Sequence, residues 1–230
     1  MVLAAAFPAL VLPPFASGLE GSLGGGLYTG LIDYLESLRE ELSQIDEGRR
    51  SDLRAIAEYV TRKSAAEKEA ELLFICTHNS RRSHMAQIWA QVVAHHLGVT
   101  GVTAYSGGME ATAFAPRAVA SMKEAGIKIR QRDHSSNPVY GISFASGVPA
   151  MEAWSKKFSD SPNPQKDFCA VMVCSQADEA CPFVPGAEKR VSIPYEDPKA
   201  FDGTPQETEK YHTCCRQIAR EMLYLFTRVK

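Results

Sequence analysis

Short apolar runs alternate with amphipathic stretches over the last two thirds of the chain. The apolar runs predict strands at residues 72–75, 102–105, 170–173 and 190–193. Helical spacing of apolar residues predicts helices over residues 82–97, 116–125 and 208–226. Strands that alternate with helices in this way are typical of an α/β fold with a parallel sheet covered by helices. We therefore predict a parallel four-stranded sheet flanked by helices, with an active site at the carboxyl ends of the strands.

The chain before this domain falls into two parts. Residues 1–26 are apolar and then rich in Gly, Ser and Pro, with prolines inside the apolar run and no preceding Lys or Arg. This pattern supports neither a signal peptide nor a membrane span, so we predict a disordered leader. Residues 27–70 show helical spacing and predict a helical extension of two amphipathic helices. Their apolar faces could dock on the domain at 71–230, dimerise or bind another protein, and docking is our expectation.

Two connecting segments have no settled assignment. The interval 131–167 lacks clear periodicity and carries Pro138, Pro149, Pro162 and Pro164, so we expect a long connection that walls the site. The stretch 106–112 follows the second strand. It could line the pocket or serve only as a strand-to-helix connection.

Composition and charge exclude several classes of protein. A net charge of −2 with 23% charged residues gives no sign of a nucleic-acid-binding protein. A chain of 230 residues with 45% hydrophobic residues needs no disulfide scaffold to build its core. The six cysteines form no paired C-x-x-C motifs, and the histidines form no close cluster, so we predict no metal site. The cysteines are consistent with a reducing cytoplasm.

The strand at 72–75 leads into the most informative motif of the chain, the segment from Cys76 to Ser83. Helix N-termini and neighbouring cations favour the nucleophilic thiolate form of a cysteine, and the sequence places both next to Cys76. Backbone N–H groups of a tight loop before a helix form an anion site. The Arg82 guanidinium can bind two oxygens of a tetrahedral oxyanion, and Ser83 can donate its hydroxyl to the thiolate. The alternative is a buried strand-end cysteine followed by an ordinary basic helix turn.

The motif resembles the phosphate loop of the low-molecular-weight protein tyrosine phosphatases and of the arsenate reductases that share their fold, over residues 71–230. This resemblance implies that Cys76 is the nucleophile, Arg82 the oxyanion clamp, Asn79 a loop-shaping residue and Ser83 a thiolate stabiliser. It also implies that the whole loop binds the oxyanion, through Thr77, His78, Asn79, Ser80, Arg81, Arg82 and Ser83. Two residues depart from the usual pattern, because His78 replaces a common glycine and Arg81 a frequent second cysteine.

A second motif, Asp197-Pro198, follows the last predicted strand. An Asp-Pro loop at this point in the chain supplies the general acid in the phosphatase family, and the resemblance assigns that role to Asp197. A carboxylic acid can protonate the leaving oxygen of a phosphate ester or of arsenate. The alternative is a simple turn, because Asp and Pro are both favoured turn residues.

A third feature, a pair of cysteines, distinguishes arsenate reduction from phosphate ester hydrolysis. Cys174 ends the apolar run at 170–173, and Cys181 follows seven residues later. This spacing resembles that of thioredoxin-coupled arsenate reductases, in which the three cysteines exchange thiol and disulfide bonds in sequence. A mobile segment between Cys174 and Cys181 would give the required reach. The alternative is a buried strand residue and a spectator, because free cysteines are often buried.

These observations predict a cytoplasmic enzyme that reduces arsenate to arsenite with thioredoxin as external reductant and no bound cofactor. The alternative function is hydrolysis of a phosphate monoester, such as phosphotyrosine, through a phosphocysteine, for which Cys76, Arg82 and Asp197 suffice. A third hypothesis is a noncatalytic redox or phosphate sensor whose N-terminal helices bind a partner. Some related arsenate reductases bind potassium, with a glutamate early in the first helix. Gln87 stands at that position, so no potassium site is predicted.

Overall fold

The computed structural model describes residues 26–230 of the chain. The leader that the sequence predicts to be disordered, residues 1–26, therefore lies outside the described residues except for Gly26. Within residues 26–230, no helix combines the length and the apolar character that a membrane crossing requires.

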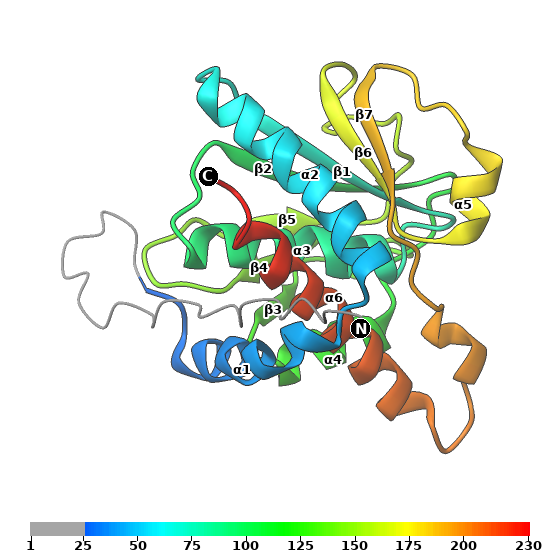
Figure 1. Cartoon of the computed structure of the whole chain (residues 1–230). Helices are drawn as coiled ribbons and strands as arrows, with labels where there is room; N and C mark the ends of the chain where they lie inside the picture. Colours follow the sequence, from blue (N-terminus) through cyan, green and yellow to red (C-terminus); the bar gives the residue numbers. More distant parts are fainter. Residues whose placement is uncertain (1–25) are drawn as a thin grey trace, which may run out of the picture.

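A four-stranded parallel sheet forms the centre of the fold, as predicted (Figure 1). Its strands are β1 (Ala70–Cys76), β2 (Val102–Gly108), β6 (Phe168–Met172) and β7 (Ala187–Ser192), in the order β2-β1-β6-β7. The two central strands β1 and β6 are almost completely buried, which explains why they are continuous apolar runs in the sequence. Because all four strands are parallel, their carboxyl ends lie along one edge of the sheet, where the predicted site residues follow them.

The helices α3 (Arg82–His96), α4 (Pro116–Glu124) and α6 (Glu207–Phe226) match the predicted helices to within about two residues at each end. The C-terminal helix α6 is the centre of the helical layer, since it contacts α3, α4 and both N-terminal helices. Its buried side chains include Ile218, Met222 and Leu225. Figure 1 shows α6 running through the middle of the molecule, beside the helices that it holds together.

The interval 131–167, which we expected to be a long connection without clear periodicity, contains strands of its own. A second, antiparallel sheet is formed by β3 (Lys128–Gln131), β4 (Tyr140–Ser143) and β5 (Met151–Ala153), in the order β3-β4-β5. Each strand has only three or four residues, too few to establish an alternating pattern. Their β conformation depends on pairing with each other, which the local sequence does not reveal.

The N-terminal extension docks on the domain, as we expected in preference to dimerisation or binding of another protein. It consists of α1 (Thr29–Arg39), the short 3-10 helix η1 (Glu40–Gln44) and α2 (Glu47–Ala65). Helix α1 packs against α6, and α2 contacts α6, β1 and β7. Leu31, Leu35 and Leu38 of α1 are completely buried. The start of α1 also lies against Gly126, whose φ of +101° favours glycine and whose missing side chain leaves room for the Leu31 backbone.

The docking of α1 predicts unequal effects of two substitutions on one helix. Leu35→Ala should lower the free energy of unfolding by about 2–5 kcal/mol, because it leaves a cavity in the core. Ile32→Ala should change it by no more than about 0.5 kcal/mol, because Ile32 is 37% exposed. Urea denaturation followed by circular dichroism measures both values. Equal effects of the two substitutions would show that α1 is not docked in solution.

Candidate active site

The loop between β1 and α3 brings the predicted nucleophile to the N-terminus of a helix. Cys76 is the last residue of β1 and only 3% exposed, and α3 begins six residues later at Arg82. The intervening residues, 77–81, form the tight turn that the sequence predicted. The positive end of the α3 dipole therefore lies near the Cys76 sulfur, a setting that binds anions.

The hydroxyl of Ser83 is oriented towards the Cys76 sulfur. The Asn79 side chain donates from Nδ2 to Ser83 Oγ at 2.8 Å, and the same oxygen lies 3.1 Å from Cys76 Sγ. Because the hydroxyl accepts from Asn79, its own hydrogen is free to point at the sulfur. Asn79 adopts a left-handed backbone conformation with φ of +43°, which asparagine tolerates better than most residues. Asn79 thus shapes the loop and orients Ser83 at once.

The stretch 106–112 supports the loop from beside β2. Met109 N donates to Cys76 O at 3.2 Å, and Glu110 N donates to Thr77 O at 2.9 Å. Gly108 has no room for a side chain, because a Cβ atom would lie 2.6 Å from the backbone nitrogen of Asn79. The segment therefore acts as more than a strand-to-helix connection.

A second support comes from the segment that follows β5. It lies in the interval 131–167 that we expected to wall the site, although the sequence singled out none of its individual side chains for contacts with the loop. The Lys156 backbone nitrogen donates to Asn79 Oδ1 at 2.8 Å, and Ser155 Oγ donates to His78 O at 3.1 Å. The Lys156 side chain is buried, and burial lowers the pKa of Lys156 to about 8. No local motif marks these residues, since their position depends on the small antiparallel sheet.

Asp197 lies directly against the loop between β1 and α3, where it contacts Arg81 and Arg82. Arg81 donates from Nε to Asp197 Oδ1 at 2.7 Å and from Nη2 to Oδ2 at 3.0 Å, a bidentate pair. Arg82 donates from Nη2 to the same Oδ2 at 2.8 Å and from Nη1 to the carbonyl of Tyr195 at 3.0 Å. Asp197 also caps the short 3-10 helix η2 (Pro198–Phe201). It therefore has the local role of a turn residue and also contacts the Cys76 loop.

The two arginines lower the pKa of this carboxylate. Burial alone would raise the pKa of Asp197, but the hydrogen bonds and charges of Arg81 and Arg82 outweigh burial and hold the pKa below its ordinary value. In this arrangement Asp197 is a carboxylate at neutral pH. Arg82 is also the residue expected to bind an oxyanion, so Asp197 and an oxyanion compete for the same guanidinium.

Cys174 lies beside the loop, whereas Cys181 lies at the far end of a short helix. Thr77, the residue after Cys76, places its Oγ1 at 3.4 Å from Cys174 Sγ. Cys174 is fully buried and caps the helix α5 (Ser175–Ala180), because its sulfur accepts from the backbone nitrogen of Ala177 at 3.3 Å. Cys181 ends the same helix and is half-buried. All six cysteines are free thiols in this structure.

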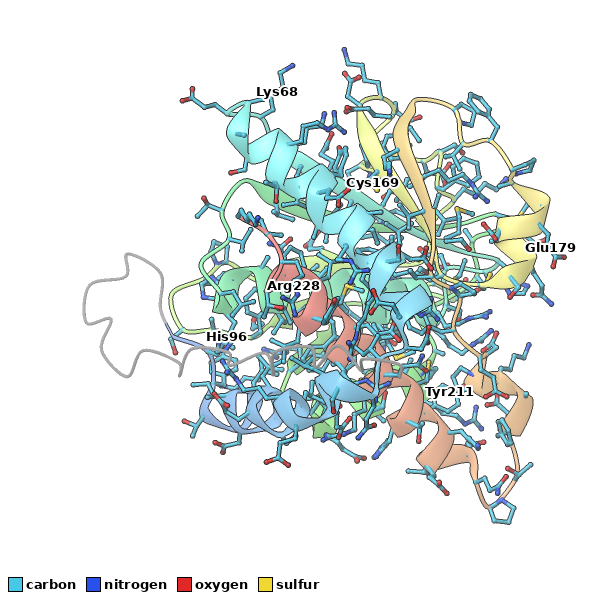
Figure 2. All side chains as sticks on the ribbon, viewed as in Figure 1. Lys68, His96, Cys169, Glu179, Tyr211 and Arg228 are labelled. Carbon is cyan, nitrogen blue, oxygen red and sulfur yellow. The ribbon has the colours of Figure 1, made fainter. Side chains whose placement is uncertain are left out.

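Helix α5 separates the two cysteines by more than a disulfide can span. In helical geometry the seven steps from Cys174 to Cys181 rise by about 10 Å, whereas the Cα atoms of a disulfide lie within about 7 Å. Only Ala177 is buried among the residues of α5, and Glu179 projects away from the sheet (Figure 2). Arg190 of β7 holds the end of the helix, donating to Cys181 O at 3.1 Å and to Asp178 O at 2.8 Å. With so little buried surface, α5 has the character of a locally unstable segment.

An open groove of about 340 Å³ adjoins the loop and connects it with solvent. It is lined on the loop side by His78, Ser80 and Arg81, and on the other side by Lys199 and Tyr211, among others. Tyr211 is labelled at the start of α6 in Figure 2. The site as a whole unites a thiol at a helix N-terminus, two guanidinium groups and a carboxylate. Such a set can bind a tetrahedral oxyanion, attack it with sulfur and protonate an oxygen that leaves.

The chain is similar in sequence to known proteins that are named arsenate reductases. An arsenate reductase of Staphylococcus epidermidis is 33% identical over 127 residues, which are 55% of this chain and 77% of that protein. An arsenate reductase of Bacillus subtilis is 33% identical over 136 residues, which are 59% of this chain and 79% of that protein.

Among solved structures, one described as an arsenate reductase in the phosphate binding state has a TM-score of 0.46 and 21% identity. The similarity covers 70% of this chain and 99% of that chain. The profile of the low molecular weight phosphotyrosine protein phosphatases matches residues 71–230, from β1 to the C-terminus. The matched region includes the Cys76 loop, both Cys174 and Cys181, and the Asp197 loop, so this chain belongs to the low-molecular-weight phosphotyrosine protein phosphatase family.

Proposed function

We propose that this protein is an arsenate reductase that uses Cys76 as nucleophile, Cys174 and Cys181 as a disulfide relay, and thioredoxin as the final reductant. The observation that carries the proposal is the position of Cys174, whose sulfur contacts the residue next to Cys76. A phosphatase that works through a phosphocysteine needs no second thiol at this point. The names of the relatives support the same substrate, since the family members with about 33% identity are arsenate reductases.

The first step is attack of the Cys76 thiolate on arsenic. A sulfur–arsenic bond forms, an arsenic–oxygen bond breaks, and the oxygen leaves as water after it receives protons. The backbone N–H groups of residues 77–81, Arg82 and the α3 dipole stabilise the negative charge of the oxyanion. When the oxyanion binds Arg82 in place of Asp197, the carboxylate loses part of the positive charge that lowers its pKa. Its pKa then rises, and it can hold the proton that the leaving oxygen needs.

The second step is attack of the Cys174 thiolate on the Cys76 sulfur. A Cys76–Cys174 disulfide forms, and the electron pair of the sulfur–arsenic bond passes to arsenic, which leaves as arsenite. Cys181 then attacks Cys174, which releases the Cys76 thiolate and leaves a Cys174–Cys181 disulfide. The dithiol of thioredoxin reduces this disulfide and is itself oxidised. Because α5 keeps Cys181 away from Cys174, the third transfer requires α5 to unwind.

Hydrolysis of phosphate monoesters is a second candidate activity of the same site. It is supported by the contact of Asp197-Pro198 with Arg81 and Arg82, because these residues and Cys76 provide a nucleophile, an oxyanion site and an acid. The two activities differ in their requirement for Cys174 and Cys181. Substitution of the outer cysteine therefore distinguishes them.

The relay predicts that Cys181→Ser reduces arsenate for about one turnover and then stops. The variant should keep wild-type hydrolysis of p-nitrophenyl phosphate, because that reaction does not use Cys181. Arsenate-dependent NADPH oxidation with thioredoxin and thioredoxin reductase measures the first activity, and release of p-nitrophenol measures the second. If wild type and variant hydrolyse the ester equally and neither reduces arsenate, the pair is structural and the protein is a phosphatase.

The double contact of Asp197 predicts a shift in the pH profile. Arg81→Met removes the bidentate partner that lowers the pKa of Asp197, so this pKa should rise. The protonated acid then persists to higher pH, and the basic limb of phenyl phosphate hydrolysis should move to higher pH. Arg117→Met is the matched control, since Arg117 pairs with Asp202 and Glu207 rather than Asp197. A basic limb that stays in place or moves down in Arg81→Met would contradict the assignment of Asp197.

A further inference from the structure

Helix α2 lies outside the region that matches the family, yet one of its side chains reaches the loop that carries Asp197. Arg49 donates from Nη2 to the carbonyl oxygen of Pro194 at 2.5 Å, across 145 residues of sequence. Its guanidinium carbon also lies 5.2 Å from the centre of the Tyr195 ring. The family match begins at residue 71, so Arg49 belongs to the part of this chain that the family profile does not describe.

A buried carboxylate on α6 forms an ion pair with the Arg49 side chain. Glu221 is 2% exposed, and its Oε2 lies 3.5 Å from Arg49 Nε. Gln217, one turn earlier on α6, donates to the other carboxylate oxygen at 3.1 Å. Burial, followed by the nearby Glu221 carboxylate, raises the pKa of Tyr195, so its phenol is neutral. Arg49 is therefore held by α6 on one side and stacked on Tyr195 on the other.

The segment 194–197 receives its contacts from two directions. On the outer side, Arg49 binds Pro194 O. On the inner side, Arg82 binds Tyr195 O and the Asp197 carboxylate. The backbone is tied to the sheet through Tyr195 N, which donates to Val173 O at 3.2 Å. A shift of the segment at Pro194 would thus move both the acid and a partner of the oxyanion-binding arginine.

We propose that Arg49 is a positioning residue for Asp197 and Arg82, through which the N-terminal extension completes the active site. Arg49 touches neither the oxyanion nor Cys76, so its effect is exerted through the loop. The inference rests on the proposed function in that turnover is its main readout. Displacement of a catalytic group by about 1 Å can cost on the order of 100-fold in rate. Loss of the contacts to Pro194 and Tyr195 should therefore reduce turnover even though the chemical groups remain.

The choice of leaving group separates positioning of the acid from a general loss of structure. Phenyl phosphate has a poor leaving group and depends on protonation by Asp197, whereas p-nitrophenyl phosphate has a good one and depends on it much less. Partial unfolding would lower both rates by the same factor. Misplacement of Asp197 should lower the phenyl phosphate rate more.

The experiment measures kcat and KM for both esters in four variants and the wild type. Arg49→Met removes the contacts. Because it leaves Glu221 buried without its cation, the double variant Arg49→Met/Glu221→Gln removes both charges together. Arg49→Lys keeps the charge and should restore part of the rate. Arg54→Met is the matched control, because Arg54 lies on the same helix and binds Tyr224 and Glu47 but not the loop.

We expect kcat for phenyl phosphate to fall by about 10-fold or more in Arg49→Met and in the double variant, with a smaller fall for p-nitrophenyl phosphate. The ratio of the two rates should stay at the wild-type value in Arg54→Met. Thermal unfolding midpoints establish that each variant is folded at the assay temperature. An unchanged ratio in the folded double variant would overturn the proposal.

A readout without turnover distinguishes failure of this inference from failure of the proposed function. Arsenate that is bound at the loop protects Cys76 from alkylation by iodoacetamide, whether or not it is reduced. If the wild type neither reduces arsenate nor hydrolyses esters, the proposed function fails. The positioning role then predicts that half-maximal protection requires several-fold more arsenate in the double variant than in Arg54→Met. Equal protection would overturn the positioning role as well.

Discussion

The carboxylate of Asp197, held between Arg81 and Arg82, joins the two halves of the site. The arginines belong to the loop after the first strand of the sheet, and the carboxylate belongs to the loop after the last strand. Burial of two guanidinium groups is tolerable here because a shared carboxylate compensates part of their charge and both groups are hydrogen-bonded. The same pairing lowers the pKa of Asp197. In the proposed function an oxyanion would bind the guanidinium that Asp197 shares, which would couple substrate binding to protonation of the acid.

The same edge of the sheet also brings a second cysteine beside the Cys76 loop. Cys174 follows the strand next to β1, so parallel pairing alone brings it beside the Cys76 loop. Cys181 is placed by α5 rather than by the sheet, and this helix has little buried surface. The sheet thus places the first two thiols, whereas a helix with little buried surface places the third. Arg190 fixes the C-terminal end of this helix to β7.

The helical extension is integrated into the domain instead of being appended to it. Its first helix contributes three fully buried leucines to the core next to α6, and its second helix sends Arg49 to the carbonyl of Pro194. Without this extension, Glu221 would be a buried carboxylate without its cation. The region matched by the family is therefore physically incomplete in this protein without residues 27–65.

The sequence by itself determined the four-stranded parallel sheet and the identity of the Cys76 loop. Both depend on contiguous residues, because the buried central strands β1 and β6 are apolar along their length and an anion loop needs its cysteine and arginine at fixed spacing. Only the tertiary structure decided the small antiparallel sheet, the two arginines on Asp197 and the contact of Arg49 with Pro194. These depend on partners far away in the chain: short strands are stabilised by their neighbours, and a long charged side chain is directed by the buried group that compensates its charge.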